Sequence, residues 1–260
     1  MIAYPEIDPV VVALGPLKVH WYGLMYLLAF GSAWWLGKRR AQVAGAPIKP
    51  AEVDDLIFYG AMGVVLGGRF GSVLFYNFDT FLADPLYLLK IWEGGMSFHG
   101  GLLGVIAGVI WFARKYKVQF HRVLDFVTPI GPIGLGAGRL GNFIGGELWG
   151  RPTDLPWGMI FPHVDNLARH PSQLYQMVLE GVILFTLVWV YSAKPRAAFR
   201  VSGLFLLGYG GQRFVVEFAR QPDAHLNYVA FDWMTQGQLL SLPMIALGIY
   251  LVVRKTSIKG

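Results

Sequence analysis

Seven predominantly hydrophobic stretches alternate with shorter polar connections along this chain. A transmembrane helix needs about 20 mostly apolar residues, and the stretches are of that order, although glycines or single charges interrupt several. The predicted membrane helices cover residues 19–37, 56–78, 99–113, 123–144, 174–191, 201–218 and 239–253. The pattern predicts an all-α integral membrane protein with about seven transmembrane helices.

Composition supports this interpretation and fixes an orientation. The chain has 260 residues, of which 55% are hydrophobic and only 15% charged, and its mean hydropathy is +0.47. Basic residues concentrate in alternate connections: Lys38, Arg39, Arg40, Lys49, Arg114, Lys115, Lys117, Arg122, Lys194, Arg196, Arg200, Arg254, Lys255 and Lys259. Since cytoplasmic loops are enriched in Lys and Arg, we expect an N-terminus outside and a C-terminus in the cytoplasm. The net charge of +6 therefore indicates orientation at the membrane, and no nucleic-acid partner.

The connections on the other side differ in kind. We expect extracytoplasmic arms at about 79–98, 145–173 and 219–238, and the second of these is rich in proline and tryptophan. No internal repeat or low-complexity tract is found. The first apolar stretch lacks the flanking features of a signal peptide, so it is interpreted as a retained membrane anchor. Residues 1–260 are predicted to form a single polytopic membrane domain with a small extracytoplasmic head.

Arginines inside the apolar stretches are the first sign of function. Arg69, Arg139, Arg213 and Arg220 lie within or at the ends of predicted membrane helices. A charge at the membrane centre is costly, and such residues are functional candidates by default. The predicted orientation brings Arg139, Asn142, Arg213, Glu217, Arg220, His99 and Tyr22 to one depth, the outer leaflet. We expect a polar site there.

Spacing refines this prediction. Arg213, Glu217 and Arg220 fall at i, i+4 and i+7, on one helix face, which allows the carboxylate to lie between two guanidinium groups. Arg139 and Asn142 are i, i+3 neighbours, among glycines that permit close helix packing or close approach of a ligand. A guanidinium group never loses its charge and matches phosphate oxygens bidentately. The cluster therefore suits binding of a phospholipid headgroup.

Simpler interpretations stay open for single residues. His99 alone is compatible with a headgroup-level histidine, Tyr22 with an aromatic belt, and Glu217 with charge neutralisation of Arg213. Several enzyme classes are excluded by motif. The chain has no cysteine, so thiol catalysis by the protein is excluded, and zinc-protease HExxH, serine-hydrolase GxSxG and acyltransferase HxxxxD patterns are missing. No metal or organic cofactor is indicated.

Five motifs together resemble one known family. They are HWYGLMY at 20–26, GGMSFHGGLLG at 94–104, GAGRLGNFIGGELWGRP at 136–152, RHPSQLY at 169–175 and EFARQPD at 217–223. They resemble the bacterial phosphatidylglycerol:prolipoprotein diacylglyceryl transferases, and the similarity extends over essentially the whole chain. One position departs, because the family usually has Asn where this chain has Gly145.

The resemblance implies an activity and a location. Family members transfer the diacylglyceryl group of phosphatidylglycerol to the lipobox cysteine of a preprolipoprotein signal peptide, forming a thioether and releasing glycerol phosphate. This is the first step of lipoprotein maturation. It implies a seven-helix, multi-pass protein of the bacterial inner membrane with a periplasmic head and an active site facing the outer leaflet.

The resemblance also implies residue roles. The catalytic positions fall on His99, Arg139 and Arg213, and substrate-binding positions on Tyr22, Arg139, Asn142, Glu147, Gly150 and Glu217. Arg139 would bind the lipid phosphate, Arg213 the leaving phosphate, and His99 would take the thiol proton. The alternative from another class is a non-catalytic phospholipid or anionic-solute transporter that uses the same arginines. It would predict an internal repeat and discontinuous helices in corresponding halves.

Overall fold

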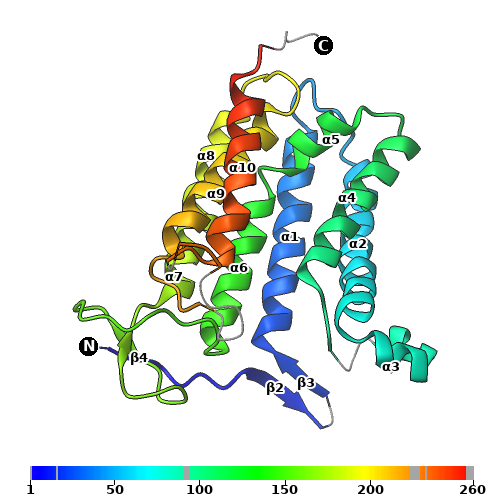
Figure 1. Ribbon diagram of the computed structural model, residues 1–260. Coiled ribbons are helices and arrows are strands. Elements are labelled where there is room, and N and C mark those ends of the chain that lie inside the picture. The colour runs from blue at the N-terminus through cyan, green and yellow to red at the C-terminus, as the bar shows by residue number, and fades with distance from the viewer. Residues whose placement is uncertain (1, 16, 91–93, 223–228, 232, 256–260) are drawn as a thin grey trace. The chain divides into compact units, whose positions relative to one another are not determined.

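A computed structural model describes residues 2–15, 17–90, 94–222, 229–231 and 233–255 of the chain (Figure 1). Trp92, in the first predicted arm, and Asp223, in the last motif, lie outside the described residues. The chain divides into two compact units, one formed by Met1–Ala33 with Val127–Gly260 and the other by Trp34–Phe126. Helix α1 (Trp21–Ala41) belongs to the first unit at its start and to the second at its end.

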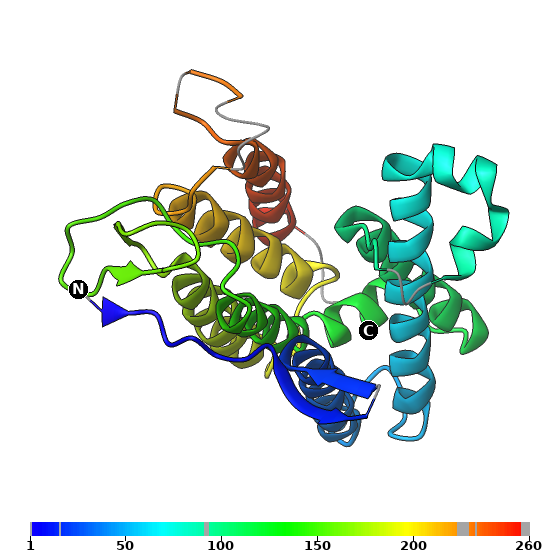
Figure 2. The ribbon, with the colours of Figure 1, turned by 90° about the horizontal axis from the view of Figure 1, so that it is seen from below.

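Four helical stretches dominate the first unit. They are α6 (Gly131–Ile144), a continuous run of α7 (Ser172–Gln176), η3 (Met177–Ile183) and α8 (Leu184–Tyr191), then α9 (Arg200–Val216) and α10 (Gln236–Val253). α6 contacts η3, α8 contacts α9, and α9 contacts α10, so these helices lie side by side (Figures 1 and 2). η3 is a π-helical turn, a feature that occurs frequently at functional sites.

Short strands extend the helical fold of the first unit. β1 (Ile2–Ala3) runs parallel to β4 (Met159–Ile160), which pairs antiparallel with β5 (Ala168–Arg169). Strands β2 (Val10–Leu14) and β3 (Leu17–His20) form a hairpin directly before α1. The all-α prediction is corrected here, because strands of two to five residues give too little hydrophobic alternation to be recognised.

A small core fixes the segment 145–173 to the end of α6. Tyr4, Phe143, Met159 and Phe161 are buried together, and the Tyr4 hydroxyl donates hydrogen bonds to the backbone oxygens of Phe143 and Ile144, each at 2.8 Å. The segment after α6 is therefore a packed structure in contact with the helix that carries Arg139.

One predicted helix is wrong as a single element. The stretch 123–144 is divided into α5 (Phe120–Val127) and α6, with a turn between them. Pro129 lacks an N–H donor and Pro132 occupies the first turn of α6, a position that proline tolerates. The two prolines therefore end one helix and begin the next, and the boundary between the two units falls at the last residue of α5, just before this turn.

Helices α2 (Glu52–Tyr76) and α4 (Phe98–Lys115) form the largest contact of the second unit. Their glycines lie face to face: a Cβ atom added to Gly67 would lie 2.3 Å from the Gly100 oxygen, and one added to Gly104 would lie 1.9 Å from the Gly63 oxygen. Small residues allow such close backbone approach in membranes. Between these helices come α3 (Phe78–Ala83) and the 3₁₀ helix η1 (Pro85–Leu89).

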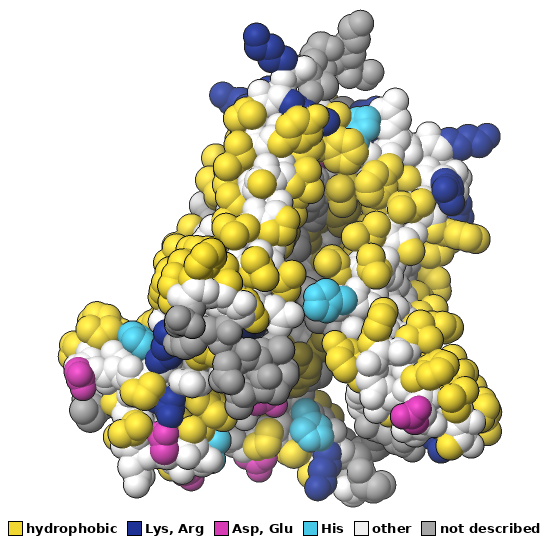
Figure 3. All heavy atoms as spheres, viewed as in Figure 1, with side chains coloured by type: hydrophobic (Ala, Val, Ile, Leu, Met, Phe, Trp, Pro, Cys, Tyr) yellow, Lys and Arg dark blue, Asp and Glu magenta, His cyan; other side chains and the backbone are white. Residues whose placement is uncertain are grey.

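Apolar helix surfaces agree with a membrane protein. Three described helical runs are long and apolar enough to cross a bilayer: Glu52–Tyr76, Ser172–Tyr191 and Gln236–Val253. Figure 3 shows hydrophobic side chains over the outward surface of α10, where Leu239, Leu247 and Val253 are exposed. The number of spans, seven, the single membrane domain and the predicted orientation stay predictions.

Candidate active site

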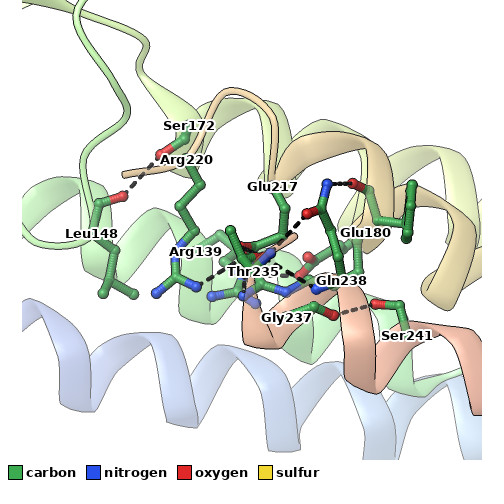
Figure 4. A network of polar contacts seen from close by, with 12 residues as sticks. Arg139, Leu148, Ser172, Glu180, Glu217, Arg220, Thr235, Gly237, Gln238 and Ser241 are labelled. Atoms are coloured by element: carbon green, nitrogen blue, oxygen red, sulfur yellow. Dashed lines mark hydrogen bonds and ion pairs between the residues drawn. The ribbon is translucent and has the colours of Figure 1, made fainter. Parts of the chain in front are cut away.

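Arg139 forms an ion pair with a carboxylate from the π-helical turn. The backbones of α6 and η3 touch at Gly136 and Gly181, where a Cβ atom on Gly136 would lie 2.8 Å from the Gly181 Cα atom. One turn further along α6, the Arg139 Nε atom donates to Oε2 of Glu180 at 2.9 Å (Figure 4). The Glu180 side chain is fully buried and that of Arg139 is 18% exposed. Tyr209 of α9 lies within electrostatic reach of both charges.

A second network surrounds Glu217 at the end of α9. Its Oε1 atom lies 2.6 Å from Nη2 of Arg213 and 3.1 Å from Nη1 of Arg220, which confirms the arrangement expected from the i, i+4, i+7 spacing. Its Oε2 atom accepts from the Thr235 hydroxyl at 2.6 Å (Figure 4). Glu217 is buried, and a Cβ atom on Gly237 would lie 2.7 Å from its carboxylate. This carboxylate thus joins two arginines to the start of α10.

The segment after α6 is tied to the same network through its backbone. The Arg151 Nε atom donates to the Arg220 oxygen at 2.9 Å, and the Gly150 N–H donates to the His170 oxygen at 2.9 Å. A Cβ atom on Gly150 would lie 2.5 Å from both the Ala219 oxygen and the His170 Cβ atom. The backbone of Gly150 therefore packs directly against Ala219 and His170, where a side chain does not fit. Burial, and then the charge of Arg151, lower the pKa of His170.

The other predicted residues of the first unit surround the end of α6. Tyr22 is 48% exposed and packs on Gly141, where a Cβ atom would lie 3.0 Å from its ring. Asn142 is partly buried one turn after Arg139. Glu147 is exposed, lies within electrostatic reach of Tyr22, and its backbone oxygen accepts from Gln173 Nε2 at 2.5 Å. The structure thus brings Tyr22, Arg139, Asn142 and Glu147 to one end of α6.

His99 and Gly145 are both exposed, at the start of α4 and the end of α6. His99 is exposed at the start of α4, where Ser97 caps the helix by accepting from the Gly100 N–H at 3.2 Å. It belongs to the second unit, so its participation in one site with Arg139 stays a prediction. Gly145 is exposed at the end of α6, and the nearest atom to an added Cβ atom would be 3.4 Å away. The Cβ atom of a larger residue would therefore meet no severe clash at this position.

Sequence reasoning missed Glu180 and the glutamines that precede it. Glu180 is the only charged residue of the apolar stretch 174–191, and this isolation was the available signal. Gln173 and Gln176 are also fully buried on this run. Within the described residues, no group of three or more His, Cys, Asp or Glu side chains could hold a metal ion.

Comparison with known proteins agrees with the motifs. Residues 9–254 match the family described as prolipoprotein diacylglyceryl transferase. A phosphatidylglycerol–prolipoprotein diacylglyceryl transferase of Legionella pneumophila (strain Lens) is 59% identical over 251 residues, which cover 96% of this chain and 98% of the relative. The corresponding protein of Ectopseudomonas mendocina (strain ymp) is 56% identical over 253 residues, covering 97% and 95%. That of Pseudomonas aeruginosa (strain LESB58) is 54% identical with the same coverage. The resemblance inferred from the five motifs is confirmed: this chain belongs to the prolipoprotein diacylglyceryl transferase family.

Proposed function

We propose that this protein transfers the diacylglyceryl group of phosphatidylglycerol to the lipobox cysteine thiol of preprolipoproteins. Its relatives are named for diacylglyceryl transfer between phosphatidylglycerol and prolipoprotein. The observation that carries the proposal is the buried arginine network of the first unit. Arg139 and Arg213 come from two apolar helices, and each is held by a buried carboxylate, Glu180 or Glu217. Such a network places fixed positive charge where a phosphodiester can be bound.

The reaction is an S-alkylation. The cysteine sulfur attacks the glyceryl carbon, a C–S bond forms, and the bond between that carbon and the phosphate oxygen breaks. The electron pair of the broken bond leaves with glycerol phosphate, and the thiol proton goes to a base. Because negative charge grows on the leaving phosphate, preorganised cationic donors lower the barrier. A free thiol has a pKa of about 8.5, so a base and a positive environment both increase the thiolate fraction.

Arg139 and Arg213 are assigned to the lipid phosphate at different stages of the reaction. Arg139 uses Nε for Glu180, and we assign its guanidinium to the phosphate of bound phosphatidylglycerol. Arg213 uses Nη2 for Glu217, while its Nη1 atom is buried without a hydrogen-bond partner in the described part of the chain. That donor suits the leaving phosphate. His99 is assigned to proton removal.

The remaining site residues hold the substrates or the site itself. Tyr22, Asn142 and Glu147 are accessible at the end of α6 and would position the headgroup and the signal peptide. Glu217 and Gly150 act through the structure, because Glu217 is enclosed by three hydrogen-bond donors and Gly150 by backbone. We assign them to positioning of Arg213 and of the segment 145–173.

The same proposal includes location. We propose a multi-pass protein of the bacterial inner membrane with about seven spans, an external N-terminus, a small periplasmic head and a cytoplasmic C-terminus. The excess of Lys and Arg in alternate connections supports this orientation. It directs the Arg139 end of α6 toward the outer leaflet, where phosphatidylglycerol and translocated signal peptides are both accessible.

The test is a reconstituted transfer reaction. Purified protein in micelles containing phosphatidylglycerol is mixed with a lipobox peptide, and glycerol phosphate release is followed together with peptide mass. We expect the wild type to form glycerol phosphate and modified peptide in equal amounts. The variant Arg39→Ala, which changes an exposed arginine at the end of α1, should do the same, and Arg139→Ala should form neither product. If no product forms although phosphatidylglycerol binds, the transporter alternative replaces this proposal.

A further inference from the structure

Several side chains of α7, η3 and α9 carry buried polar atoms that have no hydrogen-bond partner among the described residues, Gln173 and Glu180 included. Gln176 of α7 is fully buried, yet neither Nε2 nor Oε1 has a hydrogen-bond partner among the residues that the structure describes. Two atoms of α9, Oε1 of Gln212 and Nη1 of Arg213, are likewise buried without a partner, although both side chains are only partly buried. A buried polar group without a partner loses its hydration and gains nothing in return. Atoms of this kind on two helices indicate a polar ligand.

Gln176, Gln212 and Arg213 lie at one level of the helix bundle. α7 and η3 both contact α9, and α8 and α9 run in opposite directions around the turn that joins them (Figure 1). Tyr209 of α9 lies within electrostatic reach of Glu180, which aligns these two positions. Gln176 is one helical turn before Glu180, and Gln212 and Arg213 are one turn after Tyr209. Because the chains are antiparallel, both steps lead toward the same end of the bundle.

Asn142 reaches the same level from a third helix. It follows Arg139 by one turn on α6, which contacts α7. Since Arg139 is paired with Glu180, the step from Arg139 to Asn142 matches the step from Glu180 to Gln176. The polar layer formed by Asn142, Gln176, Gln212 and Arg213 therefore lies next to the Arg139–Glu180 ion pair, on its outer side in the proposed orientation.

The unsatisfied atoms specify the chemistry of the ligand. Gln176 offers two N–H donors and one acceptor, Gln212 an acceptor, and Arg213 a charged donor. A hydroxyl group both donates and accepts, so it satisfies an amide, whereas an ammonium group only donates. The charged donor beside the amides suits a phosphate oxygen. A phosphate ester of a polyalcohol matches the whole set.

We propose that Gln176 and Gln212 determine lipid headgroup specificity by binding the free hydroxyl groups of the glycerol in phosphatidylglycerol, while Arg213 binds the phosphate that leaves with this glycerol. This inference rests on the proposed function, since it names how the same site chooses its lipid. A site built to bind a hydroxyl group rejects an analogue that lacks it, because the polar atoms of the site are then left unpaired.

The experiment compares two lipids that differ only in headgroup hydroxyls. Phosphatidylglycerol and phosphatidylpropanol with identical acyl chains are given to the wild type and to Gln176→Met, which keeps the length of the side chain and removes its hydrogen-bond donors and acceptor. We expect the wild type to prefer phosphatidylglycerol by about 100-fold or more in kcat/KM. In Gln176→Met this ratio should fall at least about tenfold, mainly through poorer use of phosphatidylglycerol, with the KM for the peptide unchanged.

Controls separate recognition from a structural effect. Gln119→Met, an exposed position in the second unit, should keep the wild-type ratio. An equal loss on both lipids in Gln176→Met would overturn the inference, as would a wild type that does not distinguish them. If Gln176→Met does not accumulate, Gln212→Met is measured with the same expectation. Binding of the two lipids is measured as well as turnover. If the wild type transfers no diacylglyceryl group, the proposed function is refuted, and the binding measurement still tests the headgroup preference.

Discussion

Two arginines of apolar helices, one in each unit, have different kinds of partner. Arg69 of α2 is 2% exposed, and within the described residues its side chain donates to backbone oxygens, with Nε to Leu88 at 3.1 Å and its terminal nitrogens to Tyr87 and Gly94. The Tyr87 ring lies 4.4 Å from its guanidinium carbon. Arg69 thus holds the segment between α2 and α4 against the end of α2 by hydrogen bonds.

Arg213 instead lies in a network of side chains. It shares Glu217 with Arg220, and its Nη1 atom has no partner within the described residues. A guanidinium that donates from all three nitrogens to the backbone fixes the chain. One that is held by a carboxylate and retains a donor can bind a further oxygen. Both arginines drew attention in the sequence as intramembrane charge, and only their partners distinguish structure from function.

The largest expected effect comes from removing the partner of Arg139. Glu180→Gln keeps the shape of the side chain and leaves a buried guanidinium without its counterion. Breaking a buried ion pair on one side costs about 3–5 kcal/mol, so we expect a large drop in thermal stability in detergent together with loss of transfer activity. The double variant Arg139→Gln with Glu180→Gln should be more stable than Glu180→Gln alone. Equal stability of the two would show that the pair contributes little.

A smaller loss of stability is expected from the glycine contact of the second unit. Gly104→Ala places a Cβ atom 1.9 Å from the Gly63 oxygen, whereas Gly101→Ala, on the same helix, meets its nearest atom at 3.6 Å. Overpacking of this kind costs about 1–3 kcal/mol. Thermal unfolding of the two alanine variants should therefore differ, with Gly101→Ala close to the wild type. Equal melting temperatures would contradict the close contact of α2 and α4.

Arg69→Lys tests the fixing role directly. Lysine keeps the charge but cannot direct donors to several carbonyl groups in one plane. Loss of one charged hydrogen bond, about 1.5–3 kcal/mol when fully broken, is partly offset by the remaining ammonium. We expect the Ser97 amide, which donates to the Gly68 oxygen at 2.8 Å, to exchange with deuterium about tenfold faster. Unchanged exchange at Ser97 would indicate that the segment is held by other contacts.

Hydrophobic patterning predicted most of the helical fold because long apolar runs have few alternatives in a membrane. The predicted stretch 239–253 and helix α10 agree to within three residues. Patterning failed at 123–144, where apolar residues continue through a turn set by Pro129 and Pro132. It also missed β1 and β4, since their pairing joins residues far apart in the chain.

The candidate site was predictable where partners are close in the sequence, at the end of α9 and in the turn that follows it. Arg213, Glu217 and Arg220 were placed together by helical spacing, and the structure confirms it. Glu180 was missed as the partner of Arg139 because the pair joins two helices through the Gly136 and Gly181 contact. Spacing rules act within a helix, and which helices touch is decided by packing.

The smallest expected effect is the pH dependence of the segment that holds Gly150. The pKa of His170 is lowered from 6.5 by burial and by Arg151, so the unfolded chain takes up the proton at a higher pH than the folded protein does. The contribution of neutral His170 is fully present above pH 6.5 and is lost as the pH falls below this value toward the lowered pKa. The melting temperature in detergent should therefore decrease less between neutral and mildly acidic pH in His170→Gln than in the wild type. An unchanged pH slope in His170→Gln would mean that other groups control acid sensitivity. A reduced slope would show that protonation of the His170 side chain contributes to acid destabilisation of the protein.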